Sequence, residues 1–424
     1  MTRRTLAAWL EYIEQQHPSA IALGLERVAQ VLGKLDVRLA CPVLTVGGTN
    51  GKGSVCAMLA SILGCAGYRV GLYTSPHLLR YNERVRIDGR EADDDALCEA
   101  FEAVEQVRGE VPLTYFEFGT LAAAWLFARE ALDATILEVG LGGRLDAVNA
   151  LEPDCAVLTS IGVDHVEFLG GTREAIGREK AGIFRAAKPA VVADPDPPAS
   201  VLECASTLGA RLLLLGKDFG YVARAAQWSY WGPAGKRHNL AHPALRGAMQ
   251  LRNASAALTA LDALGGQLPI GMRDVRQGLA AVRLAGRFQV LPGRPQVILD
   301  VAHNPQAAQT LADNLADSGY AQETIAVVGM LRDKDIAGVL RAVSAQITRW
   351  HAATLGSARG ASADEIAAAL ERSGLVANVT RHESVARALD AARNEAKPDD
   401  KIVVFGSFLT VAAAMTYFDP HNNG

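Results

Sequence analysis

The sequence predicts an α/β protein, with a doubly wound, mostly parallel sheet in a first domain and a smaller α/β domain after it. Between about Pro42 and Ala193, short β-branched runs alternate with helical stretches, the pattern of parallel strands joined by helices. A glycine-rich turn follows the first of these strands directly. At 424 residues the chain is also longer than one ordinary domain, which favours two or three.

The strand pattern places the predicted domain boundary near residue 285. The first set of strands is CPVLTVG, RVGLYT, ATILEV, CAVLTSI and PAVVAD, and the second set is QVILDV, TIAVVGM, RWHAAT and KIVVFGS. Between the sets, AGRFQVLPGRPQ carries two prolines and two glycines, which indicates a hinge. Aromatic residues among glycines and polar residues predict hairpins near 216–245. We therefore expect one domain at 1–285, including the hairpins, and another at 286–424.

Composition and charge exclude several classes of protein. Apolar residues make up 50% and charged residues 21% of the chain, as is typical of a folded globular protein. The net charge is −4 and the basic residues are scattered, so no nucleic-acid-binding face is predicted. No apolar run approaches the roughly 20 residues that cross a bilayer, and the six cysteines form no CxxC pair. We expect a cytoplasmic protein without a nucleic-acid or membrane partner.

A glycine-rich segment follows the first predicted strand, Val43–Val46. Its residues, GGTNGKGS at Gly47–Ser54, lead directly into a helical stretch. Glycines let backbone N–H groups approach phosphate oxygens, Lys52 adds a mobile positive charge, and the helix presents the positive end of its dipole. The segment departs from the GxxxxGK[ST] pattern at its first glycine and by the extra Gly53 after the lysine. A phosphate site is predicted, and the alternative is a glycine-rich turn that only caps the helix.

Three polar side chains, Ser75, Glu138 and His165, follow or end predicted parallel strands. Ligands of doubly wound sheets gather beyond the carboxyl ends of the strands. A carboxylate at the end of an apolar strand, such as Glu138, is costly to bury unless a cation or hydrogen-bond donors compensate it. With a phosphate loop in the same sheet, we predict an Mg²⁺ site. The alternatives are a helix cap at Ser75, backbone N–H donors around Glu138 and a satisfied turn histidine at His165.

Eight motifs occur in order along the chain: GTNGKGS, TSPHL, TYFEFGT, ILEVGLGGRLDAVN, TSIGVDH, GREKAGIF, AGRF and DVAHNP. With these motifs the sequence resembles the bacterial folylpolyglutamate synthases, and most of all their bifunctional dihydrofolate synthase/folylpolyglutamate synthase type, which belongs with the Mur ligases. The resemblance extends from about Leu6 to Val411. It implies a Mur ligase-like fold, in which a P-loop-type domain is followed by a smaller α/β ligase domain that closes over ATP and glutamate.

The resemblance implies which residues bind the nucleotide and the metal. Those implied to bind ATP are Thr49, Asn50, Gly51, Lys52, Gly53, Ser54, Asn253, Arg287 and Asp300. Those implied to hold two Mg²⁺ ions are Ser75, Glu138, His165 and Lys180, the last as a carbamate formed with CO₂. A carbamate requires a neutral amine and hence a lowered pKa of Lys180, whereas the residues alone would make it a solvated helix lysine. The implied catalytic residues are Lys52, Lys180 and His303.

The same resemblance implies the substrates and the reaction. Residues implied to contact dihydropteroate are Ala22, Leu23, Gly24, Thr114, Tyr115, Phe116, Glu117, Leu145, Asp146 and Ala147. Phe116 offers a face for stacking, and Asp146 can accept hydrogen bonds from the pterin ring. The implied reaction is ATP-dependent amide formation between L-glutamate and dihydropteroate or tetrahydrofolate, through an acyl phosphate. A monomer is also implied, with a monovalent cation as an optional requirement.

Three other functions share parts of this pattern. A Mur enzyme acting on a UDP-sugar peptide would share the phosphate loop and the metal site, but TYFEFGT and GLGGRLDA argue against it. A P-loop kinase or nucleoside triphosphatase would transfer phosphate to a hydroxyl or to water and would need no glutamate. A regulatory nucleotide-binding module would not require the costly placement of Glu138. The sequence leaves open whether the first glutamate, later ones or both are added, and the dihydropteroate motifs favour both.

Overall fold

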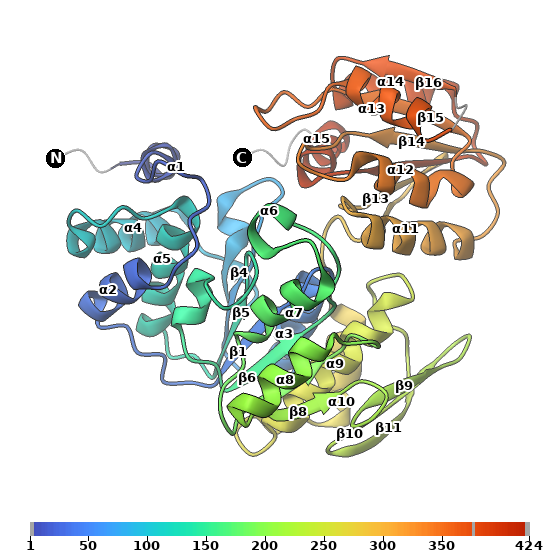
Figure 1. The fold of residues 1–424 in the computed structure, drawn as a ribbon. Helices are drawn as coiled ribbons and strands as arrows, with labels where there is room; N and C mark the ends of the chain where they lie inside the picture. Colours follow the sequence, from blue (N-terminus) through green and yellow to red (C-terminus); the bar gives the residue numbers. More distant parts are fainter. Residues whose placement is uncertain (1–3, 375–377, 420–424) are drawn as a thin grey trace. The chain divides into compact units, whose positions relative to one another are not determined.

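The computed structural model describes residues 4–374 and 378–419. The chain divides into two compact units, Met1–Ala244 with Leu251–Val282, and Leu245–Gln250 with Arg283–Gly424. In both units, helices are arranged around β-sheets (Figure 1). Each unit has its own buried apolar core.

The first unit is built on a mostly parallel sheet. Among the described residues, this sheet has eight strands in the order β4-β3-β2-β5-β1-β6-β7-β8, and only the pairings of β3 are antiparallel. The strands are β1 (Val43–Gly47), β2 (Val70–Tyr73), β3 (Val85–Ile87), β4 (Arg90–Glu91), β5 (Ala134–Glu138), β6 (Cys155–Leu158), β7 (Pro189–Val192) and β8 (Arg211–Leu214). Because β1 lies between β5 and β6, the turns after these three parallel strands meet at one edge of the sheet.

Helices cover this sheet and form much of the core. They are α1 (Leu6–Glu14), α2 (Glu26–Leu35), α3 (Lys52–Cys65), α4 (Asp94–Arg108), α5 (Tyr115–Arg129), α6 (Val166–Leu169), α7 (Arg173–Ala181), α8 (Ala199–Leu208), α9 (Met249–Ala263), α10 (Met272–Ala281) and the short 3₁₀ helices η1 (Tyr81–Arg84) and η2 (Ala147–Ala150). α1, α2, α4 and α5 pack together (Figure 1). The rings of Trp9, Phe101 and Phe118 are buried among them. α3 is apolar on most sides because it lies against the sheet and also against α10, where Gly278 contacts Ile62.

A small antiparallel sheet completes the first unit. Its strands are β9 (Gly220–Ala223), β10 (Trp228–Gly232) and β11 (Gly235–Leu240), joined by hairpins as the aromatic and glycine pattern predicted. Trp228 and Tyr230 point inward from β10 and are buried. The Tyr230 hydroxyl lies 2.8 Å from a carboxylate oxygen of Asp262 and 3.0 Å from the hydroxyl of Thr259, both on α9. The hairpins are therefore fixed to α9 by both apolar and polar contacts.

The second unit is a smaller α/β structure. Among its described residues, the sheet has six strands in the order β12-β13-β17-β14-β15-β16, with only β12 antiparallel to its neighbour. The strands are β12 (Gln289–Leu291), β13 (Gln296–Leu299), β14 (Thr324–Val328), β15 (Arg349–Ala353), β16 (Val379–His382) and β17 (Lys401–Phe405). The helices are α11 (Pro305–Asp317), α12 (Ile336–Val343), α13 (Ala363–Arg372), α14 (Val385–Glu395), α15 (Phe408–Phe418) and the 3₁₀ helix η3 (Ser344–Gln346).

The predicted α/β fold class is confirmed, including a doubly wound, mostly parallel sheet followed by a smaller α/β unit. The strands that the sequence did not predict are β3, β4, β8, β12 and β16. These strands lie at or next to the sheet edges, and β3, β4, β12 and β16 lack the continuous apolar runs of the central strands, whereas the leucines of β8 form such a run that the sequence interpretation passed over. Among the helices of the described chain, none is both long and apolar enough to traverse a bilayer.

Candidate active site

The glycine-rich segment forms a turn between β1 and α3. β1 ends at Gly47 and α3 begins at Lys52, so the first N–H groups of this helix face the turn. Gly51 caps the helix with a φ of 95°, a conformation that favours glycine, and Asn253 on α9 contacts it closely. The Lys52 amine donates to the carbonyl oxygens of Gly48 (3.1 Å) and Thr49 (3.4 Å). Backbone donors, a helix N-terminus and a lysine thus meet in one place, as anion binding requires.

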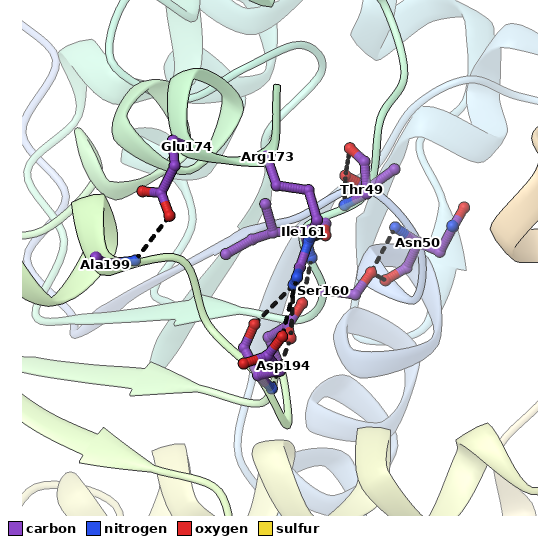
Figure 2. Close-up of polar contacts among 10 residues, drawn as sticks. Thr49, Asn50, Ser160, Ile161, Arg173, Glu174, Asp194 and Ala199 are labelled. Carbon is purple, nitrogen blue, oxygen red and sulfur yellow. Dashed lines mark hydrogen bonds and ion pairs between the residues drawn. The ribbon is translucent and has the colours of Figure 1, made fainter. Parts of the chain in front are cut away.

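The turn is held in place by the segment that follows β6. The N–H of Thr49 donates to the carbonyl of Ser160 (2.7 Å), and its hydroxyl donates to the carbonyl of Gly162 (3.1 Å). The N–H of Gly162 donates back to the Thr49 hydroxyl (3.0 Å). The N–H of Asn50 donates to the Ser160 hydroxyl (3.0 Å), and Thr159 donates its hydroxyl proton to the Asn50 carbonyl (2.7 Å). Figure 2 shows Thr49, Asn50 and Ser160 in this arrangement.

Two of the predicted metal ligands are in direct contact. Glu138 is the last residue of β5 and is buried, and its carboxylate accepts the N–H of Ser75 at 3.2 Å. His165 has a φ of 50°, which is uncommon for a residue other than glycine and often occurs at functional sites. Its N–H donates to the carboxylate of Asp164 at 2.8 Å. A buried carboxylate such as Glu138 is chemically suited to bind a divalent cation.

Lys180 lies in the last turn of α7 and is buried. Burial and, to a smaller extent, the positive charge of Lys52 lower the pKa of its amine from 10.5 to about 7, while Asp164 and Asp146 oppose the shift. The pKa of Lys180 is thus low enough for much of the amine to be neutral near pH 7. The interactions with Lys52, Asp146 and Asp164 also indicate that Lys180 faces the same region as the phosphate turn. A neutral amine is the form that reacts with CO₂ to give a carbamate.

The turn after β5 packs against the end of α7 that carries Lys180. An added side chain on Gly143 would meet the carbonyl oxygens of Glu179 and Lys180 at 2.8 Å, so this position requires glycine. The N–H of Arg144 donates to the Glu179 carbonyl at 2.8 Å. The sequence GLGGRLDA therefore connects the residues around Glu138 to those around Lys180.

Several residues implied to bind the pterin also lie together. Gly24 donates its N–H to the carbonyl of Leu145 (3.2 Å), which joins the segment 22–24 to the segment 145–147. The Phe116 ring lies over Gly140, where a side chain would approach it to 2.6 Å. Asp146 is buried and accepts the N–H groups of Leu141 (2.8 Å) and Val148 (3.0 Å). Burial nevertheless raises the pKa of its carboxyl group from 3.8 to about 6.

Thr114 and Glu117 have clear structural partners at the start of α5. They form a reciprocal capping box, in which the Glu117 N–H donates to the Thr114 hydroxyl and the Thr114 N–H donates to the Glu117 carboxylate. The buried Glu117 carboxylate also pairs with Arg27 through donors at 2.8 and 3.0 Å. The Arg27 guanidinium in turn donates to the carbonyl of Ala22 at 2.7 Å. Arg27 and Glu117 therefore hold segment 22–24 close to α5.

The second unit gathers Arg287, Asp300 and His303. Asp300 follows β13, and its carboxylate accepts the N–H groups of Phe288 and Ala302, both at 2.8 Å. Arg287 and His303 stabilise the charged form of this carboxylate, although burial makes the net shift of its pKa upward. The Arg287 guanidinium lies 5.2 Å from the centre of the Phe408 ring, and the His303 ring lies 6.2 Å from it.

Sequence reasoning missed Phe408, Asp164 and the residues 159–162 that hold the phosphate turn. Thr159 to His165 form the motif TSIGVDH, so the motif itself was a signal for the whole segment and not only for His165. No group of three or more His, Cys, Asp or Glu side chains with metal-binding geometry occurs in residues 4–374 and 378–419. The predicted metal set includes only two residues of these types, Glu138 and His165, together with a serine and a lysine.

Comparisons with known proteins agree with this architecture. The Mur ligase middle domain family matches residues 46–261, and the Mur ligase glutamate ligase domain family matches residues 286–408. The Escherichia coli (strain K12) protein named dihydrofolate synthase/folylpolyglutamate synthase is 46% identical over 420 residues, which cover 99% of this chain and 97% of that protein. A protein of the same name from Haemophilus influenzae is 42% identical and covers 96% of each chain.

Solved structures of related proteins extend the similarity to three dimensions. A structure of E. coli FolC in complex with DHPP and ADP has a TM-score of 0.94 and 45% identity, and 99% of each chain is covered. A bifunctional folylpolyglutamate synthase/dihydrofolate synthase with Mn, AMPPNP and L-glutamate bound has a TM-score of 0.90 and 45% identity, with 98% of each chain covered. The chain therefore belongs to the dihydrofolate synthase/folylpolyglutamate synthase family of the Mur ligases.

Proposed function

We propose that this protein is an ATP-dependent ligase that adds L-glutamate to 7,8-dihydropteroate, forming dihydrofolate, and to tetrahydrofolate, forming folylpolyglutamates. The observation that carries the proposal is the meeting of the phosphate turn, the buried Glu138 and the buried, low-pKa Lys180 at one edge of the first sheet. Relatives that carry both activities in their names match the chain over nearly its full length, which supports the same pair of reactions here.

We assign nucleotide binding to the first unit and to the Arg287 cluster. Thr49, Asn50, Gly51, Lys52, Gly53 and Ser54 would bind the phosphates, while Asn253, Arg287 and Asp300 would contact the rest of the nucleotide. Support comes from the helix N-terminus at the turn and from relatives solved with ADP or AMPPNP. We assign the ATP- and folate-binding roles to residues 1–285 and the ligase role to residues 286–424.

The residues around Glu138 fit a divalent cation. Ser75, Glu138, His165 and a carbamoylated Lys180 would hold two Mg²⁺ ions, which supply positive charge for the phosphate groups. The buried Glu138 carboxylate and the lowered pKa of Lys180 support this set, as does a relative solved with Mn. A requirement for a monovalent cation is a separate part of the proposal.

The folate substrate is assigned to the cluster formed by residues 22–24, 114–117 and 145–147. Phe116 would stack on the pterin, and Asp146 would pair with its donors. The hydrogen bond from Gly24 to Leu145 and the ion pair between Arg27 and Glu117 support a common site, because they join segments distant in sequence. A relative solved with DHPP supports a ligand of this class.

The reaction needs no nucleophile from the protein. The substrate carboxylate attacks the γ-phosphorus of ATP, which gives an acyl phosphate and ADP. The neutral amine of glutamate then attacks the acyl carbon, and phosphate leaves as the amide forms. Lys52 would stabilise charge on the transferring phosphoryl group. His303, which like Arg287 lies against the Phe408 ring, would be a further catalytic residue in the second unit.

The test is glutamate-dependent ADP release with 7,8-dihydropteroate and, separately, with tetrahydrofolate, with the product identified by mass. Turnover of both acceptors supports the bifunctional ligase, whereas turnover of tetrahydrofolate alone restricts the chain to polyglutamylation. ADP release that continues at the same rate without glutamate would instead support a kinase or nucleoside triphosphatase. Size-exclusion chromatography tests the proposed monomer, and fractionation of cells tests the proposed cytoplasmic location.

A further inference from the structure

Ile161 lies between two residues that contact the phosphate turn, but its own peptide groups bond elsewhere. The backbone groups of Ser160 and Gly162 bond to Thr49. The N–H of Ile161 instead donates to the carboxylate of Asp194 at 2.7 Å. Its carbonyl accepts from the Nε of Arg173 at 2.9 Å. Ser160 and Gly162 are thus bonded to the phosphate turn, whereas Ile161 between them is bonded to Arg173 and Asp194.

The pair itself is tightly connected. Arg173 is the first residue of α7, and Asp194 follows β7. The guanidinium donates to the Asp194 carboxylate at 3.2 Å and to the carbonyl of Asp196 at 2.7 Å. The N–H of Asp196 also donates to Asp194 at 3.0 Å. Figure 2 shows Arg173 and Asp194 converging on Ile161.

Burial makes Asp194 sensitive to the loss of these donors. Its side chain is 4% exposed, compared with 40% for Arg173. A buried carboxylate is costly without charged or N–H partners, so the geometry of Ile161 and that of Arg173 depend on each other. Arg252 on α9 also interacts electrostatically with Asp194 and is itself largely buried. A change at Asp194 would therefore disturb a second cation, and Arg173 is the cleaner position for a test.

The segment held by this pair connects two parts of the candidate site. Residues 159–162 bond to Thr49 and Asn50, and the same segment continues through Asp164 to His165. α7, which starts at Arg173, ends next to Lys180. A shift of Ile161 would therefore displace the phosphate turn and His165 together.

We propose that Arg173 and Asp194 are positioning residues for the metal-bound nucleotide: they fix residues 160–165 so that the phosphate turn and His165 bind the same ligand. The inference rests on the proposed function. A purely structural role would lower stability and change every kinetic constant in parallel. A positioning role raises the KM for ATP and the half-saturating Mg²⁺ concentration, with the KM for dihydropteroate unchanged.

The experiment compares Arg173→Met and Arg173→Lys with the wild-type protein. Loss of a charge-assisted hydrogen bond corresponds to about a tenfold change in an equilibrium constant. We therefore expect Arg173→Met to raise both the ATP and Mg²⁺ constants about tenfold. Arg173→Lys should have a smaller effect, because an amine retains the charge but lacks the planar set of donors.

Two control variants define the background. Arg178 lies on α7, as Arg173 does, and Arg178→Met removes its exposed ion pair with Glu203 on α8. The side chains of this pair are 60% and 66% exposed. Asp196→Asn weakens only the exposed part of the Arg173 pair, since the Asp196 side chain is 91% exposed. Both should leave the constants for ATP and Mg²⁺ unchanged, because exposed ion pairs contribute little.

Calorimetric binding of AMPPNP with Mg²⁺ separates this inference from the proposed function. Weaker binding by Arg173→Met, with unchanged binding by Arg178→Met, supports the inference even if the wild type fails to ligate glutamate. Unchanged AMPPNP and Mg²⁺ binding by a folded Arg173→Met would overturn it. If Arg173→Met does not fold, Arg173→Lys decides: the inference fails if this variant matches the wild type or if its constants for ATP, Mg²⁺ and dihydropteroate all rise equally.

Discussion

Replacing Lys180 with methionine should stabilise the protein while it removes the proposed ligase activity. Burial and Lys52 lower the pKa of the Lys180 amine from 10.5 to about 7. At about 1.4 kcal/mol for each pH unit of pKa change, the folded state then disfavours the charged amine by on the order of 5 kcal/mol. Methionine has a similar length and no charge, so Lys180→Met removes this penalty.

The stability difference should depend on pH in a defined direction. Below about pH 7 the amine is protonated in both the folded and the unfolded wild-type protein, and the full penalty applies. Between about pH 7 and 10.5 the unfolded state binds more protons, so the stability of the wild type rises with pH. The advantage of Lys180→Met should therefore be greatest near pH 6 and should shrink by about 1.4 kcal/mol per pH unit above pH 7.

Urea unfolding at several pH values between about 6 and 9, in buffer free of CO₂, measures this difference. Lys217→Met is the matched control, because Lys217 is exposed and its replacement should change the free energy of unfolding little. Glutamate-dependent ADP release should fall roughly a hundredfold or more in Lys180→Met and stay unchanged in the control. A difference in the free energy of unfolding that is independent of pH, or a destabilised Lys180→Met, would refute the reasoning.

Two further substitutions test the phosphate turn and the hairpins. Gly51→Ala should cost about 1–2 kcal/mol of stability and also raise the KM for ATP, because its φ is 95° and a side chain would meet the Asn253 amide at 2.7 Å. Gly67→Ala is the control: its φ is 88° and no neighbour lies within 4 Å, so it should lose a similar amount of stability without a change in the KM for ATP. Equal KM values for ATP in the two variants would argue against an effect of the contact between residue 51 and Asn253. Tyr230→Phe should lower the free energy of unfolding by about 1–2 kcal/mol, because it removes the buried bond to Asp262. An unchanged urea midpoint would argue against that bond.

The fold class was predictable because the central strands are buried on both faces. β1, β5, β6 and β17 are buried throughout, so their sequences are mostly apolar; the polar exceptions are Thr45, Thr135, Glu138 and Lys401. The edge strands β4 and β16 have one or more exposed side chains and gave no such signal. Burial on both faces leaves a trace in the sequence, whereas edge pairing depends on partners elsewhere in the chain.

Family motifs made the candidate site residues predictable individually, and their assigned roles stay predictions. Thr114 and Glu117 have the T-x-x-E spacing of a capping box, a local signal that the sequence interpretation did not use. The ion pair between Arg27 and Glu117 joins residues 90 positions apart, so the motif could not reveal it. Phe408 was missed for the same reason, because its proximity to Arg287 is created by folding and not by sequence spacing.

By itself the sequence determined the α/β class, the strand–turn–helix unit at Gly47–Ser54 and the family, since each depends on local periodicity or on contiguous motifs. Only the tertiary structure decided that Asn253 contacts Gly51, and that Arg173 and Asp194 bond to Ile161. Asp194 reaches Ile161 because β7 pairs with β6, and Asn253 reaches Gly51 because α9 returns to the phosphate turn. Strand order and helix docking result from the packing of distant segments against each other, and no local pattern of residues encodes them.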